Sequence, residues 1–173
     1  MTAFTSIRPS VAADEPALKV LYPSAFPDED LRPLVGDLLR LAPPVLSLVA
    51  EADGEIVGHI AFTPCRVDGH DAAVAMLAPL AVKPSLQRRG IGRALIETGI
   101  ARLEGMAGVV VLGDPGYYGQ FGFKPERGIN PPYPLPSEWE GAWQSLPLGP
   151  SARPLAGTLL PPSLWLSPAL WGP

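Results

Sequence analysis

The sequence predicts a single α+β (mixed α/β) domain in which strands and helices follow one another without an internal repeat. Two β-rich runs on either side of Asp53-Gly54-Glu55 indicate a hairpin, and a helical pattern of apolar residues follows Gly90. The β-branched run from Val109 to Leu112 is then typical of a buried strand. A chain of 173 residues with 47% hydrophobic content is long enough to bury one core. The predicted order of elements is β-α-α-β-β-β-α-β-α.

The N-terminal part is expected to contain one strand and two helices. The strand runs from Phe4 to Arg8, and Asp14-Glu15-Pro16 begins the first helix, because acids and proline are both tolerated in a first turn. The second helix is expected from about Asp28 to Leu41, with Pro33 in its first turn. Pro43-Pro44 should end it.

Three strands are expected next. Val45 to Ala52 and Ile56 to Pro64 form the hairpin, and the turn Asp68-Gly69-His70 leads into the third strand, Ala73 to Val82. Because Pro79 lacks an N–H, a bulge or splayed pairing is expected in this strand.

A helix is predicted from Gly90 to Glu104, with Arg93 and Glu97 as an i,i+4 ion pair on its exposed side. After the strand Val109 to Leu112, the glycines and proline of Gly113-Asp114-Pro115-Gly116 break the chain. Tyr117 to Phe121 should then form one or two helical turns.

The C-terminal section is rich in proline and tryptophan. Prolines are dense from Pro131 onward, and all four tryptophans of the chain lie there as well. Because disordered segments contain few aromatic residues, we expect an ordered, irregular segment that packs on the core. The prediction is one domain over residues 1–173, with a core over 1–126 and a covering section with strands over 127–173.

The overall composition excludes several classes of protein. A net charge of -4 argues against a general nucleic-acid binder. Cys65 is the only cysteine, which excludes an internal disulfide and fits a reducing cytoplasm. The N-terminus lacks the pattern of a signal peptide, and no apolar run reaches the length of a membrane span. We therefore expect a cytoplasmic protein that binds neither nucleic acid nor membrane.

The run Gln87-Arg88-Arg89-Gly90-Ile91-Gly92-Arg93 lies where a strand gives way to a helix. Glycines at a helix start let backbone N–H groups approach an anion, and arginines add bidentate hydrogen bonds, which together favour a pyrophosphate site. A Walker loop is excluded, since Gly-Lys followed by Ser or Thr is absent. A dinucleotide-binding fingerprint fails on spacing, because Lys83 to Arg89 separate the strand from Gly90 and Leu95 occupies the third glycine position.

Two longer stretches resemble a known family. Both are similar to the GNAT superfamily of acyl-CoA-dependent N-acyltransferases. The first stretch is L-A-P-L-A-V-K-P-S-L-Q-R-R-G-I-G-R-A-L, and the second is V-V-V-L-G-D-P-G-Y-Y-G-Q-F-G-F-K-P. The closest likeness is to the bacterial branch of predicted N-acetyltransferases that share Y-Y-x-x-F-G-F. Gln87, Gly90 and Gly92 match the signature Q/R-x-x-G-x-G/A, and the strong match runs from about Ile56 to Pro125.

This resemblance implies the GNAT fold, a mostly antiparallel twisted sheet splayed at the cofactor strand and flanked by helices. It implies acetyl-CoA as cosubstrate and no metal. Backbone groups of the strand would hold the pantetheine arm, and the amides and side chains of the arginine–glycine run would hold the phosphates. The implied cofactor-binding residues are Leu80, Ala81, Val82, Gln87, Arg88, Arg89, Gly90, Ile91, Gly92, Arg93 and Tyr117.

The resemblance also implies Tyr118 as the general acid, since it lies four residues before Gly122 of the Gly-Phe pair. A tyrosine there can protonate the departing thiolate, and the alternative role for Tyr118 is packing beside the cofactor. The amine acceptor, with a pKa of about 10.4, is neutral less than about one time in a thousand at pH 7 and benefits from a base. His59, Glu51, His70 and Glu126 are candidates by residue type only, and His59 is equally well explained as a hydrogen-bonded core histidine.

The predicted function is therefore acetyl transfer from acetyl-CoA to a primary amine of a small molecule or peptide, by a monomer or homodimer. A CoA-binding module without turnover is the alternative, since the strand Ala73 to Val82 lacks the carboxylate that GNAT enzymes often place there. A nucleotide-binding oxidoreductase is a third candidate. Cys65 is not expected to act as an acylated nucleophile, because no supporting His/Asn arrangement is evident.

Overall fold

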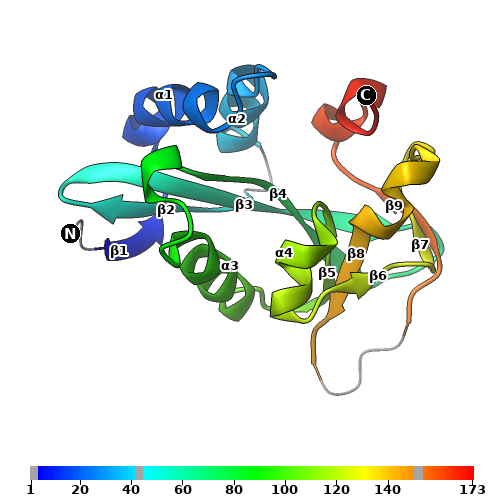
Figure 1. The fold of residues 1–173 in the computed structure, drawn as a ribbon. Helices are drawn as coiled ribbons and strands as arrows, with labels where there is room; N and C mark the ends of the chain where they lie inside the picture. Colours follow the sequence, from blue (N-terminus) through cyan, green and yellow to red (C-terminus); the bar gives the residue numbers. More distant parts are fainter. Residues whose placement is uncertain (1–3, 42–44, 150–153) are drawn as a thin grey trace. The chain divides into compact units, whose positions relative to one another are not determined.

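The computed structural model describes residues 4–41, 45–149 and 154–173, drawn as a ribbon in Figure 1. The chain divides into two compact units, one formed by Met1–Phe62 and Ala78–Glu104 and the other by Thr63–Leu77 and Gly105–Pro173. Two long strands, β3 (Glu55–Val67) and β4 (Ala73–Val82), contribute residues to both units. The hydrogen-bonded strand order is β1-β2-β3-β4-β5-β8-β6, with β7 and β9 off this path.

The first unit is built on an antiparallel set of strands. β1 (Phe4–Pro9) pairs with β2 (Leu46–Ala52), which pairs with β3. Asp53 and Gly54 join β2 to β3 with positive φ angles of 52° and 79°, as a two-residue type I′ turn requires. The predicted hairpin is therefore confirmed, with its turn one residue shorter than expected.

Helices cover both faces of these strands. In Figure 1, α1 (Glu15–Ala25) and α2 (Arg32–Leu39) lie on one side and α3 (Ile91–Ala101) on the other. On the α1–α2 side the buried core contains Leu18, Leu21, Tyr22, Val35, Val49 and Ala81. On the α3 side a Cβ at Gly99 would overlap the Phe62 ring, so this glycine lets the helix approach the sheet closely.

Two predicted helices are shorter in the structure. The second was expected from Asp28 but begins at Arg32, because the ring of Pro33 would clash with the carbonyl of residue 29 in an earlier turn. The expected stop at Pro43-Pro44 lies outside the described residues. The third was expected to reach Glu104 but ends at Ala101, where Arg102 and Leu103 donate tightened i→i−3 bonds.

The second unit contains a mixed sheet. β4 pairs with β5 in parallel, and β8 pairs antiparallel with both β5 and β6. β9 pairs antiparallel with the end of β3 and parallel with β7. The shorter strands are β5 (Met106–Leu112), β6 (Lys124–Pro125), β7 (Ile129–Asn130), β8 (Trp143–Pro147) and β9 (Gly157–Leu160).

Pro79 was expected to interrupt its strand with a bulge or splayed pairing. In the β4–β5 pairing a register shift lies between Ala73 and Ala75, away from Pro79. The last paired residues are Met76 and Val110, although β4 continues to Val82 and β5 to Leu112, so the two strands are no longer paired at Pro79, as the splayed alternative predicts. The Ala78-Pro79 peptide bond is cis.

The C-terminal tryptophans are packed, as the composition predicts. Trp143, Trp165 and Trp171 are 3–5% exposed. The indole of Trp143 donates to the carbonyl of Ile129 (2.7 Å), and that of Trp171 donates to the carbonyl of Trp165 (2.9 Å). Strands β7, β8 and β9 lie in this section, where strands were expected. A boundary at residue 126 remains a prediction.

Candidate functional site

The arginine–glycine run forms an exposed turn before α3 in the first unit. Gly90 is the N-cap of the helix, with φ of 86°, and Arg88 also has a positive φ, 61°. A Cβ at Gly90 would meet no atom within 4 Å, so the glycine is required by the backbone conformation and not by crowding. A left-handed residue followed by a helical one directs successive N–H groups to one side, which forms an anion-binding concavity.

The amides at the start of α3 have no acceptor within the helix. The first intrahelical bond runs from the N–H of Ala94 to the carbonyl of Gly90 (3.0 Å). The N–H groups of Ile91, Gly92 and Arg93 precede it and carry the positive end of the helix dipole. This donor set fits a phosphate or pyrophosphate group.

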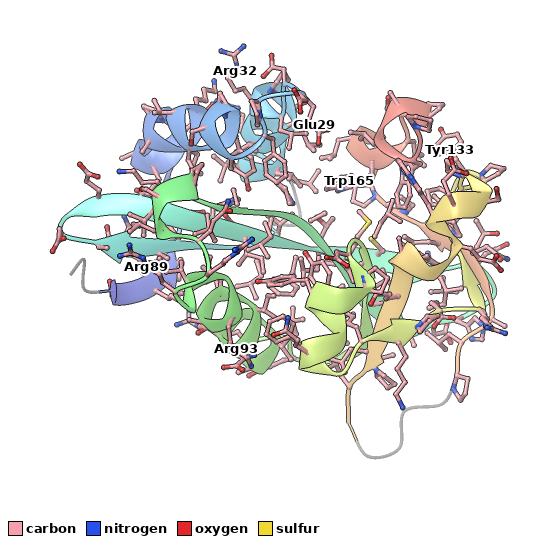
Figure 2. All side chains as sticks on the ribbon, viewed as in Figure 1. Glu29, Arg32, Arg89, Arg93, Tyr133 and Trp165 are labelled. Atoms are coloured by element: carbon pink, nitrogen blue, oxygen red, sulfur yellow. The ribbon has the colours of Figure 1, made fainter. Side chains whose placement is uncertain are left out.

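The side chains of the run divide into two kinds. Arg88, Arg89 and Arg93 are exposed and supply positive charge beside the helix start, where Figure 2 labels Arg89 and Arg93. Arg93 also pairs with Glu97 on the next turn (3.3 Å), as predicted. Gln87 has a different position, because its Nε2 donates to the carbonyl of Val82 (3.1 Å) and so ties the turn to the end of β4.

The end of β4 is held close to the same turn. Ala81 is 2% exposed and belongs to the core, whereas Leu80 and Val82 are half-buried. The N–H of Lys83 donates to the carbonyl of Val57 on β3 (2.8 Å). The structure thus brings the predicted cofactor strand and the arginine–glycine run together in one unit.

The two predicted site tyrosines lie in the second unit, on α4 (Pro115–Tyr118). The carboxylate of Asp114 caps this helix by accepting from the N–H of Gly116 (2.8 Å). The Tyr118 ring packs against Phe123 (centroids 5.7 Å apart) and edge-on to Tyr117 (5.1 Å). Burial, aided by Tyr117, raises the pKa of the Tyr118 phenol well above its usual value, so the hydroxyl stays protonated at neutral pH.

His59 is a hydrogen-bonded core residue. Its Nδ1 lies 2.6 Å from the hydroxyl of Tyr22, and its Nε2 lies 2.8 Å from the hydroxyl of Ser47. Desolvation lowers the pKa of His59 to about 4. A neutral imidazole with both nitrogens occupied is a weak base, so the packing explanation for His59 is the better supported one.

The other candidate bases also have structural partners. Glu51 accepts from Arg8 (2.9 Å), and Arg8 also pairs with the buried Asp14 (2.8 Å). The Nε2 of His70 lies 2.8 Å from the carbonyl of Ala156. Burial raises the pKa of Cys65 to about 12, which agrees with the expectation that this thiol is not a nucleophile.

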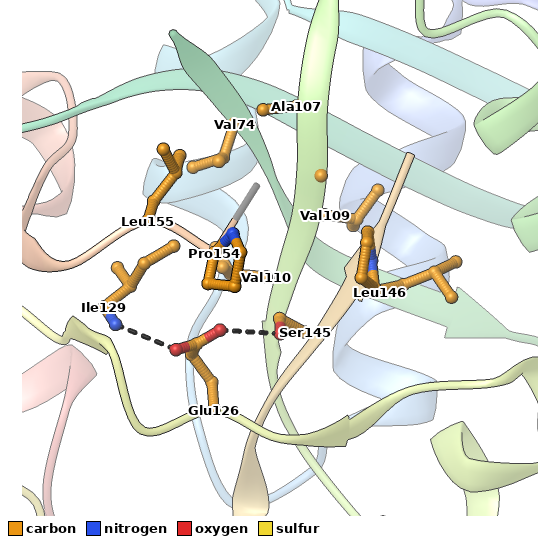
Figure 3. A pocket seen from close by; sticks show the side chains of 12 residues that line it. Val74, Ala107, Val109, Val110, Glu126, Ile129, Ser145, Leu146, Pro154 and Leu155 are labelled. Atoms are coloured by element: carbon orange, nitrogen blue, oxygen red, sulfur yellow. Dashed lines mark hydrogen bonds between the residues drawn. The ribbon is translucent and has the colours of Figure 1, made fainter. Parts of the chain in front are cut away.

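Glu126 occupies a pocket wall in the second unit. Its carboxylate accepts from the N–H of Ile129 (2.8 Å) and the hydroxyl of Ser145 (2.7 Å), as Figure 3 shows, and also from the N–H of Gly128. The pocket drawn there has a volume of about 230 Å³ and is otherwise lined mainly by apolar side chains.

Sequence reasoning missed a larger pocket in the same unit. It has a volume of about 530 Å³ and is lined by residues 130–137 together with Glu126, Ile129, Glu140, Trp143 and Thr158. The only signal in the sequence was the presence of acidic residues within the proline-rich section.

Two kinds of feature are absent from the described parts of the chain. No group of three or more His, Cys, Asp or Glu side chains there could hold a metal ion. None of the helices there is both long and apolar enough to cross a membrane.

Comparison with known proteins identifies the family. Residues 15–123 match the Acetyltransferase (GNAT) family. The chain is 42% identical over 134 residues to the uncharacterized N-acetyltransferase YjhQ of Escherichia coli (strain K12). The aligned region covers 72% of this chain and 73% of that protein.

Solved structures agree with this assignment. The GNAT family N-acetyltransferase YhbS from Escherichia coli, in complex with CoA, has a TM-score of 0.84 and 31% identity, covering 96% of this chain and 95% of that one. A GNAT family acetyltransferase from Brucella melitensis, in complex with acetyl-CoA, has a TM-score of 0.74 and 34% identity, covering 92% and 97%. The chain, with its mixed sheet flanked by helices and its arginine–glycine turn before α3, is a member of the GNAT acetyltransferase family.

Proposed function

We propose that the protein is an N-acetyltransferase that transfers an acetyl group from acetyl-CoA to a primary amine of a small molecule or peptide. The observation that supports this most directly is the concavity at Gly90, where a left-handed residue precedes the first amides of α3 beside exposed arginines. Two relatives with 31% and 34% identity are complexes with CoA and acetyl-CoA, which supports the same cosubstrate here.

The proposed cofactor contacts follow from this geometry and from the family resemblance. The amides of Arg88 to Arg93 would hold the pyrophosphate, with the arginine side chains near it or near the 3′-phosphate. Backbone groups of Leu80, Ala81 and Val82 would hold the pantetheine arm. Gln87 would act by positioning the turn, since its side chain donates a hydrogen bond to the carbonyl of Val82.

The proposed reaction is a direct attack without an acylated enzyme. Acetyl-CoA, when bound, supplies an acyl group activated as a thioester. The neutral amine nitrogen attacks the carbonyl carbon, a C–N bond forms and the C–S bond breaks. The nitrogen releases one proton to water, and the departing sulfur takes up one proton to leave as the CoA thiol. A backbone N–H of β4, at Val82 or its neighbour, would stabilise the oxyanion.

Tyr118 is proposed as the donor of the proton that the sulfur receives. Its raised pKa keeps the proton on the phenol, but makes full transfer to a thiolate with a pKa of about 8.5 uphill. The hydroxyl would therefore act mainly through a hydrogen bond that strengthens as negative charge develops on sulfur. His59 is buried and neutral, and we do not propose it as the base that removes the proton from the acceptor amine.

The test combines binding with turnover. Acetyl-CoA should bind in calorimetry, and CoA thiol should be released when an amine panel is added. Binding without thiol release across the panel would favour the CoA-binding module. Binding of NAD in place of acetyl-CoA would instead support an oxidoreductase and contradict the proposal.

A further inference from the structure

The larger pocket of the second unit has a pronounced electrostatic character. Glu126 and Glu140 line it, and no Lys, Arg or His is among its lining residues. Arg127, next to Glu126 in the chain, is exposed and does not line the pocket. Four of the lining residues are prolines, which have no N–H to donate. The lining therefore carries negative charge and no positive charge, which suits a cation.

The walls of this pocket are fixed by the protein's own hydrogen bonds. Glu126 is held by the N–H groups of Gly128 and Ile129 and by the hydroxyl of Ser145, the last at 2.7 Å. Figure 3, which shows the smaller pocket that Glu126 also lines, draws the bonds to Ile129 and Ser145. The hydroxyl of Tyr133, labelled in Figure 2, donates to the carbonyl of Leu166 (3.0 Å). Trp143 is held through its indole, as described above. Because these side chains are already ordered, a ligand would lose little affinity to ordering them.

The pocket and Tyr118 are connected at the C-terminal end of β5. Trp143 of the pocket is the strand partner of Leu112, and the N–H of Gly113 donates to the carbonyl of Ala142 (2.9 Å). Gly113 in turn lies directly against the Tyr118 ring. A molecule reaching from the pocket past Gly113 would therefore approach the proposed acid.

We propose that this pocket binds a second, cationic group of the acceptor, so that the preferred substrates are diamines or polyamines. This rests on the proposed acetyltransferase function. A site with two carboxylates stabilises the protonated form of an amine, and a protonated nitrogen cannot attack a thioester. The pocket therefore suits the distal ammonium of the substrate, while the reacting nitrogen lies outside it.

The chain offers a matched pair of variants for the test. Glu140 and Glu138 are exposed acids two residues apart in the same short 3-10 segment, Ser137–Ala142, but only Glu140 lines the pocket. The side chain of Glu140 has no ion pair or hydrogen bond in the described regions, so Glu140→Gln should fold normally. Glu138→Gln removes the same charge from the neighbouring surface.

The first measurement is calorimetric titration with 1,4-diaminobutane and, as the monoamine probe, n-butylamine. Wild type should bind the diamine at least about fivefold more tightly, which corresponds to an exposed ion pair of about 1 kcal/mol. Glu140→Gln should lose about fivefold in diamine affinity with n-butylamine unaffected, and Glu138→Gln should match wild type. Equal binding of the two amines by wild type, or equal losses in the two variants, would overturn the proposal.

The second measurement is steady-state acetylation of the same two amines. The Glu140→Gln variant should raise KM for the diamine by about fivefold, leaving its kcat and the affinity for acetyl-CoA unchanged. Equal kcat/KM for diamine and monoamine in wild type would remove this inference but leave the acetyltransferase function intact. Selective diamine binding without any acetyl transfer would contradict both the function and the acceptor role of the pocket.

Discussion

The ring of Tyr118 occupies the space that a side chain on Gly113 would need. A Cβ at Gly113 would overlap the ring edge, so the glycine at the end of β5 determines where the phenol of α4 can lie. Tyr118 is further confined by Phe123 and Tyr117. Gly113 thus positions the proposed general acid.

The first prediction concerns Gly113→Ala. The added methyl group should displace the Tyr118 ring and lower kcat by about tenfold, because general acid catalysis depends on hydrogen-bond reach. Acetyl-CoA affinity should change little. The matched control is Gly119→Ala, whose Cβ would meet nothing within 4 Å in a helical backbone. Wild-type kcat in Gly113→Ala would show that the ring position is not critical.

The second prediction distinguishes the two neighbouring tyrosines. Tyr118→Phe keeps the ring and its packing but removes the hydroxyl, and should lower kcat by about 10–100-fold. Tyr117→Phe should retain most of its turnover. Because desolvation raises the pKa of Tyr118 above its usual value of about 10, the wild-type kcat should show no Tyr118 titration up to about pH 10. If Tyr117→Phe lost its kcat while Tyr118→Phe kept the wild-type kcat, the general-acid role would belong to Tyr117.

The third prediction concerns the anion site. Gly90→Asp introduces a negative charge at the start of α3 and should weaken acetyl-CoA binding at least tenfold in calorimetry. Gly54→Asp is a matched control, because Gly54 also has a positive φ (79° against 86°) and open space around it, but lies in the β2–β3 turn. Both variants should lose similar stability, and only the first should lose affinity. Equal affinity in the two would contradict the cofactor assignment.

The fourth prediction concerns pH and His59. Its folded pKa of about 4 lies below the ordinary value of 6.5, so the unfolded chain binds more protons as pH falls through this range. Stability should therefore decrease from pH 7.5 to pH 5, by about 2 kcal/mol from this group. Asp14, whose pKa is lowered by Arg8, contributes to the pH dependence of stability only in more acidic solution.

Urea unfolding at the two pH values measures this effect. His59→Gln, which can keep one or both hydroxyl contacts without titrating, should be less stable at pH 7.5 but should lose most of the pH dependence. His70→Gln removes the other histidine, which is in a turn near the surface, and this variant should keep the pH dependence of stability. An unchanged slope in His59→Gln would show that other groups determine the acid sensitivity.

The sequence alone determined the local features of the molecule. These features are the β2–β3 turn, the start of α1, the left-handed turn at Gly90 and the break at Gly113, and they depend on backbone preferences within a few residues. Glycine and proline restrict or permit particular φ values, so these features can be derived without the rest of the fold. The family resemblance came from the same short stretches and is confirmed.

The tertiary structure decided what each polar side chain faces. His59, Tyr22 and Ser47 meet across up to 37 positions of sequence, and only this packing makes His59 a buried neutral residue and not a base. Glu126 likewise gained its place in a pocket wall through Ile129 and Ser145. Burial and hydrogen-bond partners depend on elements far apart in the chain, whereas residue type shows only which groups are able to titrate.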